Sequence, residues 1–408
     1  MSRHALLGLL CLHFTVAHAA GVQIVLDYTY DTTHFFGSGN PNGAAAGATA
    51  KATLEEAARF LSESLEDTLS PISTPDFFRS TVSSGIATWQ WSLNFTNPTT
   101  ASTTTLYDED IVANEYRIYV GARSLSGSTV AEGGRGGFGY SYNPQGSFSA
   151  SEISQLDNIT DQFISSVTRR GEPEGEFANW GGFLTIDRDG STDWHYDWTT
   201  TPASNKTDFY SVVVHELVHG LGFGTSTQWT DLVTAGKFMG QQAYLANGNV
   251  RPSVTGGHWA ANTASTIVGT SQSQEASLDP NIDKGQRKYL TTLDAAALRD
   301  IGWDVQYLSP LPPGMDGDFN NDGQVDAADY ALWRDHRGAA TEAAINYNGN
   351  GGGIDQSDYN LWRANYGATS AIAATTTPVT APEPAAGWLV LSGLSLGLPR
   401  RRPTGRRL

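Results

Sequence analysis

The sequence predicts an α+β protein in which a large domain with a mixed sheet precedes a small α-helical module. Short runs of β-branched and aromatic residues alternate irregularly with amphipathic stretches through most of the chain, which favours helices packed on a sheet. One stretch, residues 212–223 (VVVHELVHGLGF), has the apolar character of a buried helix. Near the C-terminal end, an acidic loop that leads into a helical stretch occurs twice.

The individual elements follow from composition and spacing. The strand-like runs cover residues 22–30, 87–95, 115–120 and 181–187, and the amphipathic stretches cover residues 52–69 and 151–169. Two stretches rich in glycine are predicted to be loops, residues 37–47 and 133–146. The sequence GGFLTID of residues 181–187 fits either an edge strand that accepts an extended peptide or an interior strand.

The first 19 residues have the organisation of a secretory signal peptide. Arg3 precedes an apolar run over residues 5–16, and Ala17-His18-Ala19 matches an A-x-A cleavage site. The single cysteine, Cys11, lies in this segment, so we expect the exported chain to have neither disulfides nor thiolate metal sites. Its stability outside the cytoplasm would come from core packing and bound ions.

The chain is strongly acidic, with a formal net charge of −17 over 408 residues. Such a surface repels phosphate backbones, which argues against nucleic acid as a partner. The acidic surplus suits a protein that binds calcium and stays soluble outside the cell.

Residues 215–219 read HELVH. On a helix with about 3.6 residues per turn, His215 and His219 stand one turn apart on one face, so both imidazoles can reach one metal ion. Imidazole is a good zinc ligand, and a catalytic zinc site with three protein ligands keeps one position for water. Glu216 would take the proton of that water as it attacks a carbonyl polarised by the metal. The pattern predicts a zinc hydrolase.

The third zinc ligand must come from another part of the chain. The compact pattern HExxHxxGxxH requires a histidine where this sequence has Thr225. His258, in the sequence GGHW, is the leading candidate because the other downstream histidine, His336, belongs to the C-terminal module. Glu275 and Asp231 are alternatives, since carboxylates also bind zinc.

From residue 208 to residue 303 the chain resembles the leishmanolysin branch of the metzincin zinc proteases. The resemblance is carried by HELVHGLGF, a following insertion, GGHW, QEASLDP and a final YLTTLDAAALRDIGW. It implies a metzincin-like protease domain with a mixed sheet and an active-site helix. It also implies zinc ligands, a general base and a turn glycine after the helix, which are His215, His219 and His258, Glu216, and Gly222.

The sequence departs from this family at one position. Metzincins carry a methionine below the metal, in the turn after the third ligand, whereas this chain has Leu278 there. A leucine has a similar volume and makes no metal contact, so the exchange is expected to be tolerated at modest cost.

After a proline-rich linker, residues 309–316, the composition changes to that of a calcium-binding module, residues 317–368. The segment DGDFNNDGQVDAADYALWR places oxygen atoms at the spacing of a calcium loop, with Gly323 at its sharp turn. The predicted ligands are Asp318, Asn320, Asp322, the backbone carbonyl of Gln324, Asp326 and Asp329.

The module contains a repeat, because DYALWR from Asp329 returns as DYNLWR from Asp358. Paired loops of this kind are similar to type I dockerin modules, which implies a cohesin-like partner. A purely structural calcium hairpin is the alternative. In the second loop Asn346, Asn348 and Asn350 stand in place of acids and one glycine is additional, so weaker calcium binding is predicted there.

The C-terminal end consists of a Thr/Ala-rich linker, residues 369–381, and a segment with the order of a sorting signal, residues 382–408. A Pro-Glu-Pro sequence precedes an apolar run shorter than a membrane span of about 20 residues, and arginines follow. This order resembles the PEP-CTERM tails of Gram-negative bacteria. It implies recognition by a membrane exosortase and a final location at the cell surface, the outer membrane or the extracellular matrix. A retained tail anchor is the alternative.

Together these features predict an exported zinc endopeptidase acting on proteins or peptides, with residues 20–308 as the catalytic domain and Zn²⁺ and Ca²⁺ as bound ions. The alternative is a calcium-stabilised surface or matrix protein whose protease domain is inactive and serves binding. The intact HELVH sequence favours the enzyme, because a domain kept only for binding need not retain Glu216 as a general base.

Overall fold

The computed structural model describes residues 21–73, 77–270, 272–308, 317–320, 324–339, 342–345, 348–349 and 353–368. The signal segment, both linkers, the C-terminal segment, Asp322, Asn346 and Asn350 lie outside the described residues. The mixture of helices and strands confirms the α+β class. Within the described ranges, no helix is both long enough and apolar enough to cross a membrane.

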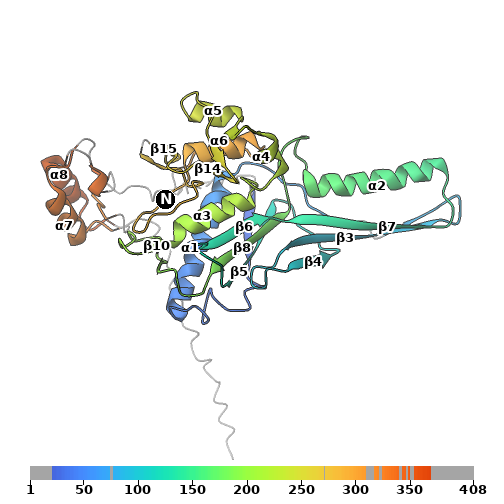
Figure 1. Ribbon diagram of the computed structural model, residues 1–408, viewed down its shortest axis with the longest axis horizontal. Coiled ribbons are helices and arrows are strands. Elements are labelled where there is room, and N and C mark those ends of the chain that lie inside the picture. The colour runs from blue at the N-terminus through green and yellow to red at the C-terminus, as the bar shows by residue number, and fades with distance from the viewer. Residues whose placement is uncertain are drawn as a thin grey trace, which may run out of the picture.

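A four-stranded sheet forms the centre of the large domain (Figure 1). Its strands, in spatial order, are β1 (Gln23–Asp27), β5 (Glu115–Arg123), β8 (Gly181–Asp187) and β6 (Ala131–Arg135). The first three run parallel, and β6 runs antiparallel to β8. The predicted mixed sheet is therefore confirmed. Within the described chain β6 pairs only with β8, which leaves its outer edge open.

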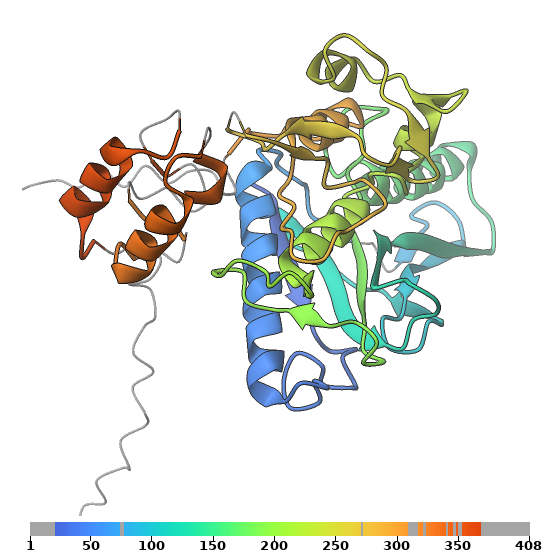
Figure 2. The same cartoon turned by 60° about the vertical axis from the view of Figure 1, so that its left-hand side comes forward.

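Alternating side chains of β5 separate the two layers that cover this sheet. Tyr116, Ile118 and Val120 belong to a core shared with α1 (Ala44–Ser64) and α3 (Phe209–Gly220). Tyr119, between them, belongs to a second core on the opposite face. Successive side chains of a strand point to opposite faces, so this pattern marks a strand that is covered on both. Helix α1 packs against β1 and α3, while α3 also packs on β6 and β8 (Figure 2).

The second core lies under a long ribbon that extends away from the central sheet (Figure 1). Here β3 (Ile86–Thr96) pairs antiparallel with β2 (Phe77–Arg79), β4 (Thr103–Tyr107) and β7 (Gly137–Gln145). Helix α2 (Ala150–Thr168) covers the ribbon, with the ring of Phe163 stacked on Trp91 at 3.5 Å between centroids. A capping box between Ser149 and Glu152 starts α2.

Short elements make up the rest of the large domain. The helices are α4 (Thr227–Asp231), α5 (Gln241–Ala246) and α6 (Thr292–Asp300). The strand pairs are β9 (Trp194–His195) with β10 (Thr207–Asp208), β11 (Val233–Thr234) with β12 (Lys237–Phe238), β13 (Val254–Thr255) with β14 (His258–Trp259), and β15 (Ala264–Thr266) with β16 (Ser273–Glu275).

Three expectations about these elements are corrected. Residues 181–187 form the interior strand β8, so the edge-strand interpretation is wrong for this segment. The glycine-rich residues 133–146 are not a loop but most of β6 and β7, because backbone pairing needs no side chain. The helix expected over residues 52–69 is α1, which starts within the stretch predicted as a loop, at three consecutive alanines, the strongest helix formers.

The C-terminal module contains α7 (Ala327–His336), the 3-10 helix η1 (Glu342–Ile345) and α8 (Gln356–Asn365). The indole of Trp333 donates to the Asp355 carbonyl and that of Trp362 donates to the Asp326 carbonyl, both at 2.7 Å. Each helix also begins with a capping box between two aspartates. The two sequence repeats therefore make the same contacts, an indole–carbonyl hydrogen bond and a capping box each.

Candidate metal centre

Helix α3 is anchored at its first turn by buried polar contacts. Asp208 caps the helix by accepting hydrogen bonds from the backbone N–H of Ser211, at 3.0 Å, and from its hydroxyl, at 2.6 Å. The guanidinium of Arg287 holds the same carboxylate at 2.7 Å. Three consecutive buried valines, 212–214, then continue the helix through the core. These contacts hold the helix in place on the sheet.

The C-terminal end of α3 is equally constrained. Gly222 has a φ of +98°, a left-handed conformation that glycine adopts readily, so it makes the turn that ends the helix, as expected. The carbonyl groups left without helical partners are satisfied from elsewhere. Thr225 Oγ1 donates to the His219 carbonyl, Tyr116 Oη to that of Gly220 and Trp303 Nε1 to that of Leu221. Thr225, which occupies the third-ligand position of the compact HExxHxxGxxH pattern, therefore caps the end of the helix.

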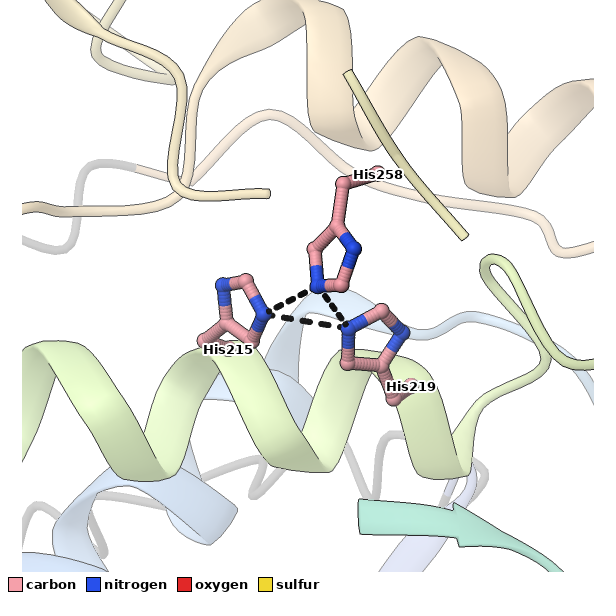
Figure 3. A group of neighbouring side chains, drawn as sticks. All are labelled: His215, His219 and His258. Carbon is pink, nitrogen blue, oxygen red and sulfur yellow. Dashed lines mark hydrogen bonds between the residues drawn. The ribbon is translucent and has the colours of Figure 1, made fainter. Parts of the chain in front are cut away.

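The structure brings His215, His219 and His258 together (Figure 3). The first two project from α3, and His258 comes from β14 on the facing side. Their Nε2 atoms form a triangle with sides of 3.0, 3.0 and 3.1 Å. Zinc–nitrogen distances of about 2.0–2.1 Å allow three atoms so spaced to share one ion. Among the described residues, only this group of three or more His, Cys, Asp or Glu side chains brings its ligand atoms within 4.8 Å.

The hydrogen bonds of two rings show which nitrogens are free to bind. His215 Nδ1 lies 2.7 Å from the Ser277 carbonyl and His219 Nδ1 lies 2.8 Å from the Phe223 carbonyl. A carbonyl only accepts, so each Nδ1 carries the proton. Burial lowers the pKa of both rings, that of His219 to about 4, so both are neutral near pH 7.

It follows that the Nε2 atoms of His215 and His219 face each other as two lone pairs. No proton is available to turn their 3.0 Å separation into a hydrogen bond. Burial also lowers the pKa of His258, which favours its neutral form. A cation between the three rings would satisfy all of them, and backbone carbonyls on Nδ1 are the partners that orient metal-binding histidines. The donor set therefore fits zinc.

The two alternative third ligands lie outside the group of three histidines. Glu275, in β16, forms an ion pair with the buried ammonium of Lys288 at 2.6 Å. Asp231 is the last residue of α4 and is exposed. Neither belongs to the histidine group. Leu278 is fully buried in the turn whose Ser277 carbonyl accepts from His215.

Glu216 follows His215 on α3 and is buried, with 8% of its surface exposed. Burial raises the pKa of its carboxyl to about 8; the charge of Glu132 adds to this and a backbone hydrogen bond from Gly133 opposes it. Both neighbours belong to β6. The candidate general base therefore sits between the histidines and the open edge strand.

A cleft of about 600 Å³ opens beside these groups. Its lining includes residues 128–131, which lead into and begin β6, and the segment from Ser277 to Lys288. His215, Glu216 and His258 line it as well. The cleft therefore reaches two of the histidines, Glu216 and Ala131, the first residue of β6.

The structure describes only some of the predicted calcium ligands. Asp318 and Asp329 are buried, and the Asp329 carboxylate accepts from the backbone of Asn320 and of Asp326, at 2.9 and 2.7 Å. Asp326 caps α7, whereas Gln324 is exposed. In the second repeat, Asp355 caps α8 and Asp358 is buried in the position equivalent to Asp329.

Sequence reasoning missed two buried charged residues near the site, Lys288 and Asp294. Lys288 carried no recognisable motif. Asp294 does carry a signal, since Thr291 and Asp294 have the spacing of a capping box and form one at the start of α6, but that spacing says nothing about its other partners.

No family model, curated protein or solved structure matches the chain.

Proposed function

We propose that this chain is an exported zinc endopeptidase that hydrolyses peptide bonds in proteins or peptides. The observation that carries the proposal is the convergence of three neutral histidines on one point, with the Nε2 lone pairs of His215 and His219 directed at each other. A buried arrangement of this kind is unfavourable without a cation, because lone pairs at this distance repel. The resemblance to metzincin proteases supports the same assignment.

In this proposal each residue has one role. His215, His219 and His258 hold the zinc ion, which supplies a Lewis acid and makes water a better nucleophile. Glu216, whose ionised form a bound cation would favour, receives the proton of the attacking water and passes it to the leaving amine. The open edge of β6 pairs with the backbone of the substrate and directs it along the cleft. Strand β8, whose sequence also fitted such an edge strand, lies inside the sheet.

The remaining segments support a role outside the cell. The calcium loops and the resemblance to type I dockerins favour a module that binds Ca²⁺ and a cohesin-like partner. The signal segment and the PEP-CTERM-like tail favour export and processing by an exosortase in a Gram-negative bacterium, with a final location at the cell surface, outer membrane or matrix.

Zinc content and proteolysis of the purified full chain test the proposal. Wild type should contain about one zinc and cleave casein or a peptide library, and Glu216→Ala should keep the metal and lose cleavage. His258→Ala should lose both, whereas His336→Ala, an exposed histidine of the C-terminal module, should lose neither.

Other results would change the assignment. Zinc bound at wild-type level in His258→Ala would transfer the third-ligand role to Glu275 or Asp231. Zinc binding without cleavage of any protein tested would favour the alternative, a surface protein whose protease domain serves binding.

A further inference from the structure

We infer that Asp294 is a positioning residue of the metal centre, which joins the segment carrying His258 to the turn that orients His215. The inference rests on the proposed metal-binding role of the three histidines. Asp294 is fully buried and stands in the first turn of α6. It touches no histidine of the group, so any effect on the metal must act through other residues.

Both oxygens of the Asp294 carboxylate are occupied by donors from three segments. Oδ1 accepts from Trp259 Nε1 at 2.8 Å and from the Leu278 backbone at 3.3 Å. Oδ2 accepts from the Ser277 backbone at 2.9 Å. It also accepts from the backbone and the hydroxyl of Thr291, at 2.9 and 2.6 Å. One side chain therefore links β14, the turn at residues 277–278 and the start of α6.

Two of these segments position histidines of the proposed metal centre. Trp259 is the residue after His258, so its indole determines how β14 presents that histidine. Ser277 contributes the carbonyl that accepts from His215 Nδ1 at 2.7 Å. The backbone of Trp259 also donates to the Leu278 carbonyl at 3.0 Å. Through Asp294, the position of the third ligand and the orientation of the first are coupled.

Only a carboxylate satisfies this set of donors. All five groups donate a proton, and a carboxylate accepts at both oxygens. An asparagine of the same shape would place an NH₂ group against N–H donors at one of the two positions. Burial raises the pKa of the Asp294 carboxyl, and the hydrogen bonds from Thr291, Trp259 and Ser277 oppose this by favouring the ionised form.

Metal affinity of the full chain, measured by competition with a chromophoric chelator, tests the inference independently of proteolysis. Asp294→Asn should weaken zinc binding by about 10–100-fold, the range for partners that orient metal ligands, and should alter the visible spectrum of the Co²⁺-loaded protein. Thr291→Val is the matched control, since it breaks the same helix cap but leaves the bonds to Trp259, Ser277 and Leu278. Its affinity and spectrum should stay at wild-type values.

A second variant covers the case in which Asp294→Asn does not fold. Trp259→Phe keeps an aromatic ring in the core and removes only the indole donor, and it should also weaken metal binding and change the Co²⁺ spectrum. Wild-type affinity and spectrum in Asp294→Asn or in Trp259→Phe would overturn the inference and leave the proposed function intact. A wild-type chain that binds no zinc would overturn both.

Discussion

The backbone of Gly133 lies directly against the backbone of Glu216. A Cβ atom on Gly133 would lie 2.3 Å from the Glu216 carbonyl oxygen, a distance at which one of the two segments must move. The edge strand β6 and the helix with the candidate general base are thus in contact without intervening side chains. In the proposed mechanism, the distance between a substrate strand paired with β6 and the carboxylate of Glu216 depends on this contact.

Gly133→Ala is therefore expected to displace β6 from α3 and to lower kcat/KM for peptide hydrolysis by about tenfold or more, because small displacements of substrate are costly in rate. Zinc content should not change. Gly134→Ala is the matched control, since the nearest group there is the ring of Phe183 at 3.0 Å, which can shift. Wild-type activity in Gly133→Ala would contradict a role of β6 in substrate alignment.

Thr225→Val is expected to lower the free energy of unfolding by about 1 kcal/mol, the usual contribution of one hydrogen bond. The substitution keeps the size of the side chain and removes the hydroxyl that donates to the His219 carbonyl at 2.7 Å. Thr225→Ser, which keeps the hydroxyl, should recover most of the loss. Chemical denaturation of wild type, Thr225→Val and Thr225→Ser measures the three free energies of unfolding. Equal stability of Thr225→Val and wild type would show that the cap is unimportant.

Removal of zinc should lower the midpoint of thermal unfolding. A ligand that binds only the folded state stabilises it by about 4 kcal/mol at a thousandfold excess over Kd. Scanning calorimetry of the protein after treatment with 1,10-phenanthroline, and again after zinc is added back, measures this stabilisation. His219→Ala should show no zinc-dependent shift, and His336→Ala should behave as wild type. A midpoint indifferent to zinc in the wild type would argue against the metal centre.

Calcium binding should depend on the first loop more than on the second. Asp318→Asn should remove the tighter site in a calcium titration by calorimetry, because fewer carboxylates mean weaker binding. Asp358→Asn should affect only the weaker site. Asp335→Asn, an exposed acid of the same module, should change neither. Equal affinities at the two sites would show that asparagines in the second loop do not matter.

Stability should fall as the pH rises from about 4 to about 7, through Asp67. Burial, together with the charges of Glu172 and Asp304, raises the pKa of the Asp67 carboxyl to about 7, whereas an unfolded aspartate has a pKa of about 3.9. Between these values the folded state holds a proton that the unfolded state has lost, so rising pH favours unfolding. Asp67→Asn should remove this contribution. Denaturation of zinc-free wild type and Asp67→Asn at several pH values measures how the stability of each depends on pH. Parallel curves of stability against pH would contradict the prediction.

Several features of the fold could be predicted from local sequence. The spacing of His215 and His219 places both on one helix face, and three valines bury the preceding turn. The interior strand of residues 115–120 and the helix of residues 151–169 were recognisable because periodicity is set by backbone geometry within each element. The helix starting at Ala44 was partly missed, since glycines on either side of the alanines suggested a loop.

Long-range relationships could not be predicted in the same way. GGFLTID forms an interior strand and a glycine-rich segment forms the edge strand beside it, because strand order is decided by pairing between distant segments. The partners of Asp294 were equally hidden. Its spacing from Thr291 predicts a helix cap, but Trp259 and Ser277 reach it only in the folded chain.

The sequence by itself determined the two histidines on one helix turn, the adjacent Glu216 and the repeated acidic loops, because each depends on spacings of a few residues. Tertiary structure alone brought His258 to within 3.0 Å of His219 from 39 residues away, paired Glu275 with Lys288, and made β6 the edge strand of the sheet in the described part of the chain. Short-range geometry is fixed by the covalent backbone. Contacts between distant segments are fixed by the packing of the whole core, which no local spacing encodes.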